Sequence, residues 1–204
     1  MNPDGGGADE LRRRFIEDVR RNPHNRAILD GLSALELPDA WLVAGCLFQT
    51  VWNLQCGRPP EAGIRDYDLF YFDGSDLSAE AEQEVEARVR RYFAHLPVAI
   101  EAKNQARVHT WYAEYFGDSY APLYCSQDGI DRFLVECTCV GLKPGLHGPL
   151  LHAPYGLQVL YNGILAPNPG FDRPRLYAAK AADYRARWSW LRLAGGAGAH
   201  AAAP

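Results

Sequence analysis

The sequence predicts an α/β or α+β fold in which a short β-sheet is flanked by helices. Through residues 9–103, apolar segments with the alternation of strands are separated by segments whose apolar residues recur at helical spacing. Hydrophobic residues make up 48% of the chain and aromatic residues 12%, which is enough for a packed core. The length of 204 residues suits one domain, or one domain with a small appendage.

The first half of the chain predicts strands and helices in turn. Asn22 followed by Pro23 is typical of a helix start, because asparagine caps the helix and proline fits its first position. Gly57 and the pair Pro59-Pro60 are typical of a helix end. The expected strands are "AWLVAG" (40–45), "IRDYDLFYFD" (64–73) and "VAIEAK" (98–103). The expected helices cover residues 9–21, 22–35, 46–56, 78–94 and 105–116.

The pattern is weaker in the second half. It predicts helices at 126–134, 155–165 and 175–193, and strands at 135–143 and 149–154 around the turn "PGLHG". Both ends are rich in glycine or alanine and can bury little, so we expect them to be disordered. The expected organisation is a disordered N-terminus (1–8), a core with N-terminal helices (9–116), a C-terminal extension packed on the core (117–193) and a disordered tail (194–204).

Charge and composition exclude several classes of protein. The formal charge of −4 disfavours a long nucleic-acid partner, which would need a basic surface. No apolar run approaches the roughly 20 residues of a membrane span, and the acidic N-terminus does not resemble a signal peptide. We therefore expect a cytoplasmic protein with reduced, mostly buried thiols. The cysteines are Cys46, Cys56, Cys125, Cys137 and Cys139.

Acidic residues on neighbouring strands predict a metal site. Asp66 and Asp68 lie two positions apart on one strand, so they point to the same face at about 7 Å from each other and repel unless a cation lies between them. The next strand carries Glu101, and three converging carboxylates suit Mg²⁺, or Mn²⁺ in its place. The turn at Gly45-Cys46 starts a helix, whose N-terminus favours phosphate. Together these features predict a site for Mg²⁺ and a nucleoside triphosphate.

Several stretches resemble the nucleotidyltransferase superfamily with a polymerase-beta-like core, and more narrowly a bacterial family of small nucleotidyltransferase-like proteins. They are "WLVAGCLFQTVWN", "RDYDLFYFD", "EAKNQARVHTWY" and "APYGLQVLYNGILAPNP", within residues 35–180. The resemblance implies a minimal nucleotidyltransferase core, in which a short mixed β-sheet is flanked by helices, with a C-terminal α/β extension. Two features depart from the superfamily pattern. Cys46 stands where serine or glycine is usual, and the loop "GRPPEAG" lengthens the distance to Asp66.

The resemblance also implies a reaction, in which a nucleoside monophosphate moves from a nucleoside triphosphate to an acceptor and pyrophosphate is released. Asp66, Asp68 and Glu101 would be the catalytic residues and the metal ligands. The acidic chain favours a small molecule or a protein side chain as the acceptor over a polynucleotide. The expected nucleotide-binding residues are Gly45, Cys46, Lys103, Arg107 and Lys180.

Other interpretations of these residues stay open. Asp66 and Asp68 could lie on a solvated edge strand, and Glu101 could simply pair with Lys103. Lys103 and Arg107 could satisfy backbone groups or neighbouring carboxylates. The chain could also be a non-catalytic module that binds nucleotide or metal, or a metal-dependent phosphohydrolase that uses the same acids.

Overall fold

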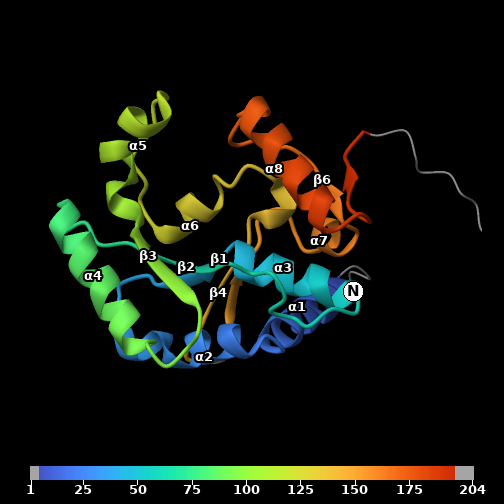
Figure 1. Cartoon of the computed structure of the whole chain (residues 1–204), viewed down its shortest axis with the longest axis horizontal. Coiled ribbons are helices and arrows are strands. Elements are labelled where there is room, and N and C mark those ends of the chain that lie inside the picture. Colours follow the sequence, from blue (N-terminus) through green and yellow to red (C-terminus); the bar gives the residue numbers. More distant parts are fainter. Residues whose placement is uncertain (1–4, 196–204) are drawn as a thin grey trace, which may run out of the picture.

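The computed structural model describes residues 5–195 and contains a five-stranded mixed sheet with the strand order β3-β2-β1-β4-β5 (Figure 1). The pair β2–β3 is parallel, and the other pairs are antiparallel. The strands are β1 (Trp41–Val43), β2 (Asp66–Tyr71), β3 (Ala99–Asn104), β4 (Gly141–Lys143) and β5 (Leu150–His152). The predicted fold class, a short mixed sheet flanked by helices, is therefore confirmed.

The helices follow the capping signals of the sequence in the first half of the chain. The Asn22 side chain accepts hydrogen bonds from the backbone N–H groups of His24 and Asn25 at the start of α2. Ser78 caps α4 in the same way through the N–H of Ala81. The helices are α1 (Gly5–Arg20), α2 (Pro23–Gly31), α3 (Gly45–Gln55), α4 (Ala79–Tyr92), α5 (Val108–Phe116), α6 (Ser126–Ile130), α7 (Gln158–Tyr161) and α8 (Pro174–Arg187). Short 3₁₀ turns cover Leu32–Leu35, Gln105–Arg107 and Glu136–Thr138.

One face of the sheet builds the main core. Side chains alternate along β2, so that Tyr67, Leu69 and Tyr71 are buried in this core. Helices α1 and α2 lie below the sheet in Figure 1, and α3 contributes fully buried Trp52 to the same core. The residues between Tyr67, Leu69 and Tyr71 point to the opposite face, where the candidate site lies.

The second half of the chain completes this sheet. β4 pairs with the central strand β1, with Leu42 opposite Leu142. Helix α8 places Tyr184 in the main core, and Trp188 follows it there. The indole N–H of Trp188 donates a hydrogen bond of 3.0 Å to Oδ1 of Asn53. Residues 117–193, expected as an extension packed on the core, thus supply two of the five strands of the sheet and part of the main core.

Several predicted boundaries differ from the structure. Helix α1 begins at Gly5, so residues 5–8 are helical rather than disordered, while residues 1–4 and 196–204 lie outside the described residues. Two residues of the expected tail, 194 and 195, form a turn after strand β7 (Arg192–Leu193). The helix predicted at 126–134 ends at Ile130, and the one predicted at 175–193 ends at Arg187.

Two apolar segments contain the predicted element only in part. Only Gly141–Lys143 of the strand predicted at 135–143 is a strand, and a 3₁₀ turn precedes it. The helix predicted at 155–165 is a single turn, because Gly163 adopts a left-handed φ of 63° and the chain continues as a strand. Short buried apolar runs suit strands, helices and irregular segments alike, so their pattern does not discriminate. The additional strands β6 (Ile164–Leu165) and β7 (Arg192–Leu193) form a small parallel pair.

The cysteines are all unpaired thiols. Cys46, Cys137 and Cys139 are buried, Cys125 is half-buried and Cys56 is exposed. Within residues 5–195, no helix combines the length and the apolar character needed to cross a bilayer.

Candidate active site

The parallel pair β2–β3 carries the candidate residues on the face opposite the main core. Asp68 lies beside Glu101 in the register of this pair, and Phe70 lies beside Lys103. Asp66 shares the face of Asp68, because it lies two residues earlier on the same strand. Neighbouring strands are about 4.8 Å apart, so the site residues of β2 and β3 form one continuous surface.

Asp66 and Asp68 line a cavity of about 320 Å³, which we call the acidic cavity. Its other walls come from the start of α3, from residues 132–135 and from α8. The acidic cavity is lined by Ala44, Gly45, Phe48, Gln49, Asp66, Asp68, Arg132, Phe133, Leu134, Val135, Thr138, Lys180 and Tyr184. Segments far apart in the sequence therefore meet at the two aspartates.

The turn from β1 to α3 brings a helix N-terminus to Asp68. Val43, the last residue of β1, pairs with Asp68, and Ala44 follows with the strained dihedral angles φ 52° and ψ −118°. The carbonyl of Ala44 accepts the first hydrogen bonds of the helix, and the N–H groups of Gly45 and Cys46 have no partner in the described part of the chain. A Cβ on Gly45 would lie 3.0 Å from Nε2 of Gln49, so glycine leaves this turn open.

Asp68 is the carboxyl whose charge the free protein disfavours. Burial raises its pKa to about 7, the charges of Asp66 and Glu101 act in the same direction, and Lys103 and Lys180 oppose them. Within residues 5–195, the side chains of Asp66 and Asp68 accept no hydrogen bond and form no ion pair. Two adjacent carboxylates without a positive partner fit a divalent cation, which prefers oxygen ligands.

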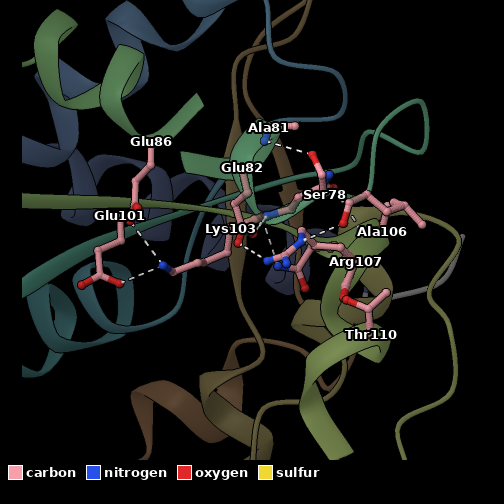
Figure 2. A network of polar contacts seen from close by, with 12 residues as sticks. Ser78, Ala81, Glu82, Glu86, Glu101, Lys103, Ala106, Arg107 and Thr110 are labelled. Carbon is pink, nitrogen blue, oxygen red and sulfur yellow. Dashed lines mark hydrogen bonds and ion pairs between the residues drawn. The ribbon is translucent and has the colours of Figure 1, made fainter. Parts of the chain in front are cut away.

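Glu101 lies on the same face but is directed elsewhere. Its carboxylate is 3.7 Å from Nζ of Lys103, which also lies 3.2 Å from Glu86 on α4 (Figure 2). Across residues 5–195, no three His, Cys, Asp or Glu side chains come close enough together to hold a metal ion. The three predicted acids therefore share a surface without forming a three-ligand cluster, and Asp66 and Asp68 are the pair that faces the acidic cavity.

Glu101 lines a second and larger cavity of about 830 Å³, which we call the aromatic cavity. Five of its lining residues come from α5, and four of these are aromatic: Trp111, Tyr112, Tyr115 and Phe116. Residues 132–134 line both cavities, so the two adjoin along this segment. The candidate site thus has an acidic part and an aromatic part, with Glu101 in the latter.

The structure divides the predicted nucleotide-binding residues between the two cavities. Gly45 and exposed Lys180 line the acidic cavity. The Cys46 thiol is fully buried in the main core, where burial raises its pKa, so only the backbone of Cys46 can meet a ligand. Lys103 and Arg107 line the aromatic cavity instead.

Arg107 is held by α4. It pairs with Glu82 (Figure 2), and its Nε donates a hydrogen bond of 3.2 Å to the carbonyl of Leu77. The side chains of Arg107 and Glu82 are only 12% and 14% exposed. Glu82 also accepts a hydrogen bond of 2.8 Å from the N–H of Asn104 at the end of β3. These contacts give Arg107 a structural role that joins α4 to β3.

Arg132 is the functional candidate that the sequence did not reveal. It lines both cavities, its guanidinium lies 4.2 Å from the ring centroid of Tyr120, and it donates a hydrogen bond of 2.8 Å to the carbonyl of Ala121. It lies within the helix predicted at 126–134 but follows the end of α6 at Ile130. No local pattern marks such a residue, because its role depends on tertiary packing.

Comparisons with known proteins agree with this architecture. A family model described as "Nucleotidyltransferase" matches residues 30–193. An NMR structure described as revealing a CCA-adding enzyme head domain is similar to this chain, with a TM-score of 0.73 and 29% sequence identity. The similarity covers 89% of this chain and 94% of that one. No curated protein matches the sequence.

Proposed function

The chain belongs to the nucleotidyltransferase family, and from this premise we propose that it moves a nucleoside monophosphate from a nucleoside triphosphate to an acceptor hydroxyl in a Mg²⁺-dependent reaction. The observation that carries the proposal is the acidic cavity, where the unpaired carboxylates of Asp66 and Asp68 lie beside the N-terminus of α3 and Lys180. A nucleoside triphosphate with Mg²⁺ matches both parts of this cavity, because its phosphates suit the helix start and its cation suits the acids.

Each residue has a role in binding the donor. Asp66 and Asp68 would hold Mg²⁺, or Mn²⁺ in its place. The bound ion would neutralise phosphate charge and stabilise the charge that develops during transfer. The free N–H groups of Gly45 and Cys46 would donate hydrogen bonds to phosphate oxygens, and Lys180 would meet the departing pyrophosphate.

The transfer step needs a base and a fixed geometry. Glu101 accepts the proton of the acceptor hydroxyl, and the oxygen forms a bond to the α-phosphorus. The bond from the α-phosphorus to the oxygen bridging it to the β-phosphorus breaks, and its electron pair leaves with pyrophosphate. Lys103, paired with Glu101 and Glu86, positions the Glu101 carboxylate. Positioning and charge supply most of the catalysis in such transfers.

The acceptor is a small molecule or a protein side chain in this proposal, in keeping with the formal charge of −4. A nucleic acid is the second candidate, because the similar solved structure is described as a CCA-adding enzyme head domain. The two differ in what they require of the protein surface, since a polynucleotide needs several unpaired cations along its path.

The test is an assay with α-³²P-labelled triphosphates, Mg²⁺ and three classes of acceptor: hydroxyl-bearing small molecules, proteins and RNA. We expect label on one acceptor with equimolar pyrophosphate, and a loss of at least about 100-fold in Asp66→Asn and Asp68→Asn, the scale seen when a group that stabilises transition-state charge is removed. Glu84→Gln, an exposed change on α4, serves as the control. Release of inorganic phosphate would indicate a phosphohydrolase, and binding of Mg²⁺ and triphosphate without turnover would indicate a non-catalytic module. Either result would overturn the proposal.

A further inference from the structure

The aromatic cavity adjoins the acidic cavity but is built differently. Aromatic rings form a continuous wall in it: the ring centroids of Tyr112 and Phe116 are 4.6 Å apart, and those of Tyr112 and Tyr120 are 4.4 Å apart. Tyr115 is 79% exposed on the same helix. A concave site that presents aromatic surface to solvent is typical of ligand binding, since such rings are otherwise buried.

We infer that the aromatic cavity binds the acceptor, and that the acceptor is a small molecule with a flat apolar ring system and a nucleophilic hydroxyl. This inference rests on the proposed function, because it assigns to the aromatic cavity the second substrate of that reaction.

The position of Glu101 is the first argument. Gly45, Asp66, Asp68 and Lys180 line the acidic cavity, whereas Glu101 lines the aromatic cavity. The attacking and leaving oxygens lie roughly in line on opposite sides of the phosphorus during the transfer. With the phosphates bound at the acidic cavity, the hydroxyl must approach from the side of Glu101. That side is the aromatic cavity.

The chemistry of the wall is the second argument. A flat ring can stack on half-buried Trp111 or on Phe116, which is 48% exposed, and aromatic pairs of this kind contribute more than their buried area alone. Leu176 of α8 adds apolar surface from the opposite side and is 42% exposed. Helices α5 and α8 stand apart above the sheet in Figure 1, on either side of α6. The volume of about 830 Å³ lies in the range of sites for small molecules.

The charges of the cavity are the third argument, and they disfavour a polynucleotide. Arg107 pairs with Glu82, and Lys103 pairs with Glu86 and Glu101. Among the cations that line the cavity, Arg132 alone has no carboxylate partner within residues 5–195. Single-stranded nucleic acid needs a row of free cations for its phosphates in addition to stacking rings. This cavity offers the rings and one free cation, which suits a compact acceptor.

The test uses 2-naphthalenemethanol as a probe, because it combines a flat ring system with a primary hydroxyl. NMR titration of the full chain without nucleotide should show binding that is at least about fivefold weaker in Tyr115→Ser and Leu176→Arg. Matched controls are Tyr124→Ser and Leu146→Arg, which change residues that are 86% and 100% exposed and lie outside the cavity. Equal affinity in the cavity variants and the controls, or no binding at all, would overturn the inference.

Two further measurements determine which class of ligand binds the aromatic cavity and how the ligand is oriented in it. A hexamer of oligoadenylate should not displace the probe; displacement that is lost in Tyr115→Ser would assign the cavity to RNA and overturn the small-molecule assignment. With Mn²⁺ and an α,β-methylene triphosphate bound, the hydroxymethyl protons of the probe should relax faster than its distal ring protons. The reverse order would overturn the assignment to the acceptor. Failure of the wild type to bind Mn²⁺ would contradict the proposed function. If the probe still binds the wild type and Asp68→Asn equally well in that case, the aromatic cavity is a binding site that does not depend on the proposed function.

Discussion

Asp68 shows how one residue of this chain links stability to function. Strand β2 holds its carboxyl beside Asp66 in a half-buried position, and burial raises its pKa from the usual 3.8 to about 7. Between these two values, the folded chain keeps a proton that the unfolded chain releases. The contribution of Asp68 to the free energy of unfolding therefore falls as the pH rises from about 4 to about 7. A bound cation would reverse this penalty.

Asp68→Asn should stabilise the free protein at pH 8, because asparagine keeps the size of the side chain and removes its charge. We expect the free energy of unfolding to increase by up to about 4 kcal/mol at pH 8, and by much less at pH 4, since the pKa is raised by about three units and each unit corresponds to about 1.4 kcal/mol. Urea unfolding at both pH values measures the difference. Glu84→Gln should show no comparable dependence on pH, and a destabilised Asp68→Asn at pH 8 would show that the free carboxylate has a partner.

At the level of secondary-structure elements, contacts within the unit β2–α4–β3 hold the strands that carry the candidate site. The pairs Glu82–Arg107 and Glu86–Lys103 join α4 to the end of β3. Asn104 joins the end of β3 to the end of β2, because its side chain donates a hydrogen bond of 2.8 Å to the carbonyl of Asp73 after β2. The orientation of the β2–β3 surface therefore depends on contacts that include Lys103 and Arg107, two predicted ligand-binding residues.

Glu82→Gln should destabilise the protein by about 2–3 kcal/mol, because it leaves the guanidinium of Arg107 nearly buried without its carboxylate. Arg107→Met should cost less, and the double variant should cost less than the sum of the two single changes. Thermal and urea unfolding measure these differences, with Glu84→Gln as the control. If Arg107→Met instead left stability unchanged and weakened triphosphate binding tenfold or more, Arg107 would be a ligand rather than a structural residue.

The elements differ in how far their sequences predict them. The segments 40–45, 64–73 and 98–103 contain strands as predicted, because glycine, proline and capping residues separate them from the helices. The segments 135–143 and 155–165 contain the predicted strand and helix only in part, because short apolar runs that enter the core suit either kind of element.

At the scale of the whole molecule, the site is assembled from both halves of the chain. Alternation along two strands was enough to place Asp66, Asp68 and Glu101 on one face. The pairing of Glu101 with Lys103 was one of the alternatives that the sequence left open, whereas the contact of Lys103 with Glu86 of a separate helix was not predictable. The aromatic cavity was not predicted either. It forms where α5, residues 129–134 and α8 come together, and the periodicity of the sequence does not predict these tertiary contacts.

The shared sheet predicts that the chain folds as one cooperative unit. β1 pairs with β2 on one side and with β4 on the other, and Trp188 lies in the core formed by the first half. We expect a single urea transition with the same midpoint by tryptophan fluorescence and by far-UV circular dichroism. A fragment of residues 9–116 should stay unfolded by both probes. Two separate transitions, or a folded fragment, would show that residues 117–193 are an independent appendage.

The proposed reaction depends on the binding of a divalent cation by Asp66 and Asp68 beside the triphosphate. Isothermal titration of Mg²⁺ with an α,β-methylene triphosphate, at pH 6 and pH 8, tests it most directly. Because only ionised Asp68 can bind the ion and its pKa is about 7, we expect affinity about tenfold higher at pH 8 than at pH 6. We also expect Mg²⁺-dependent binding to be lost in Asp66→Asn and Asp68→Asn but kept in Glu84→Gln. An Mg²⁺ affinity that is the same at both pH values and unchanged by these two substitutions would contradict cation binding by Asp66 and Asp68.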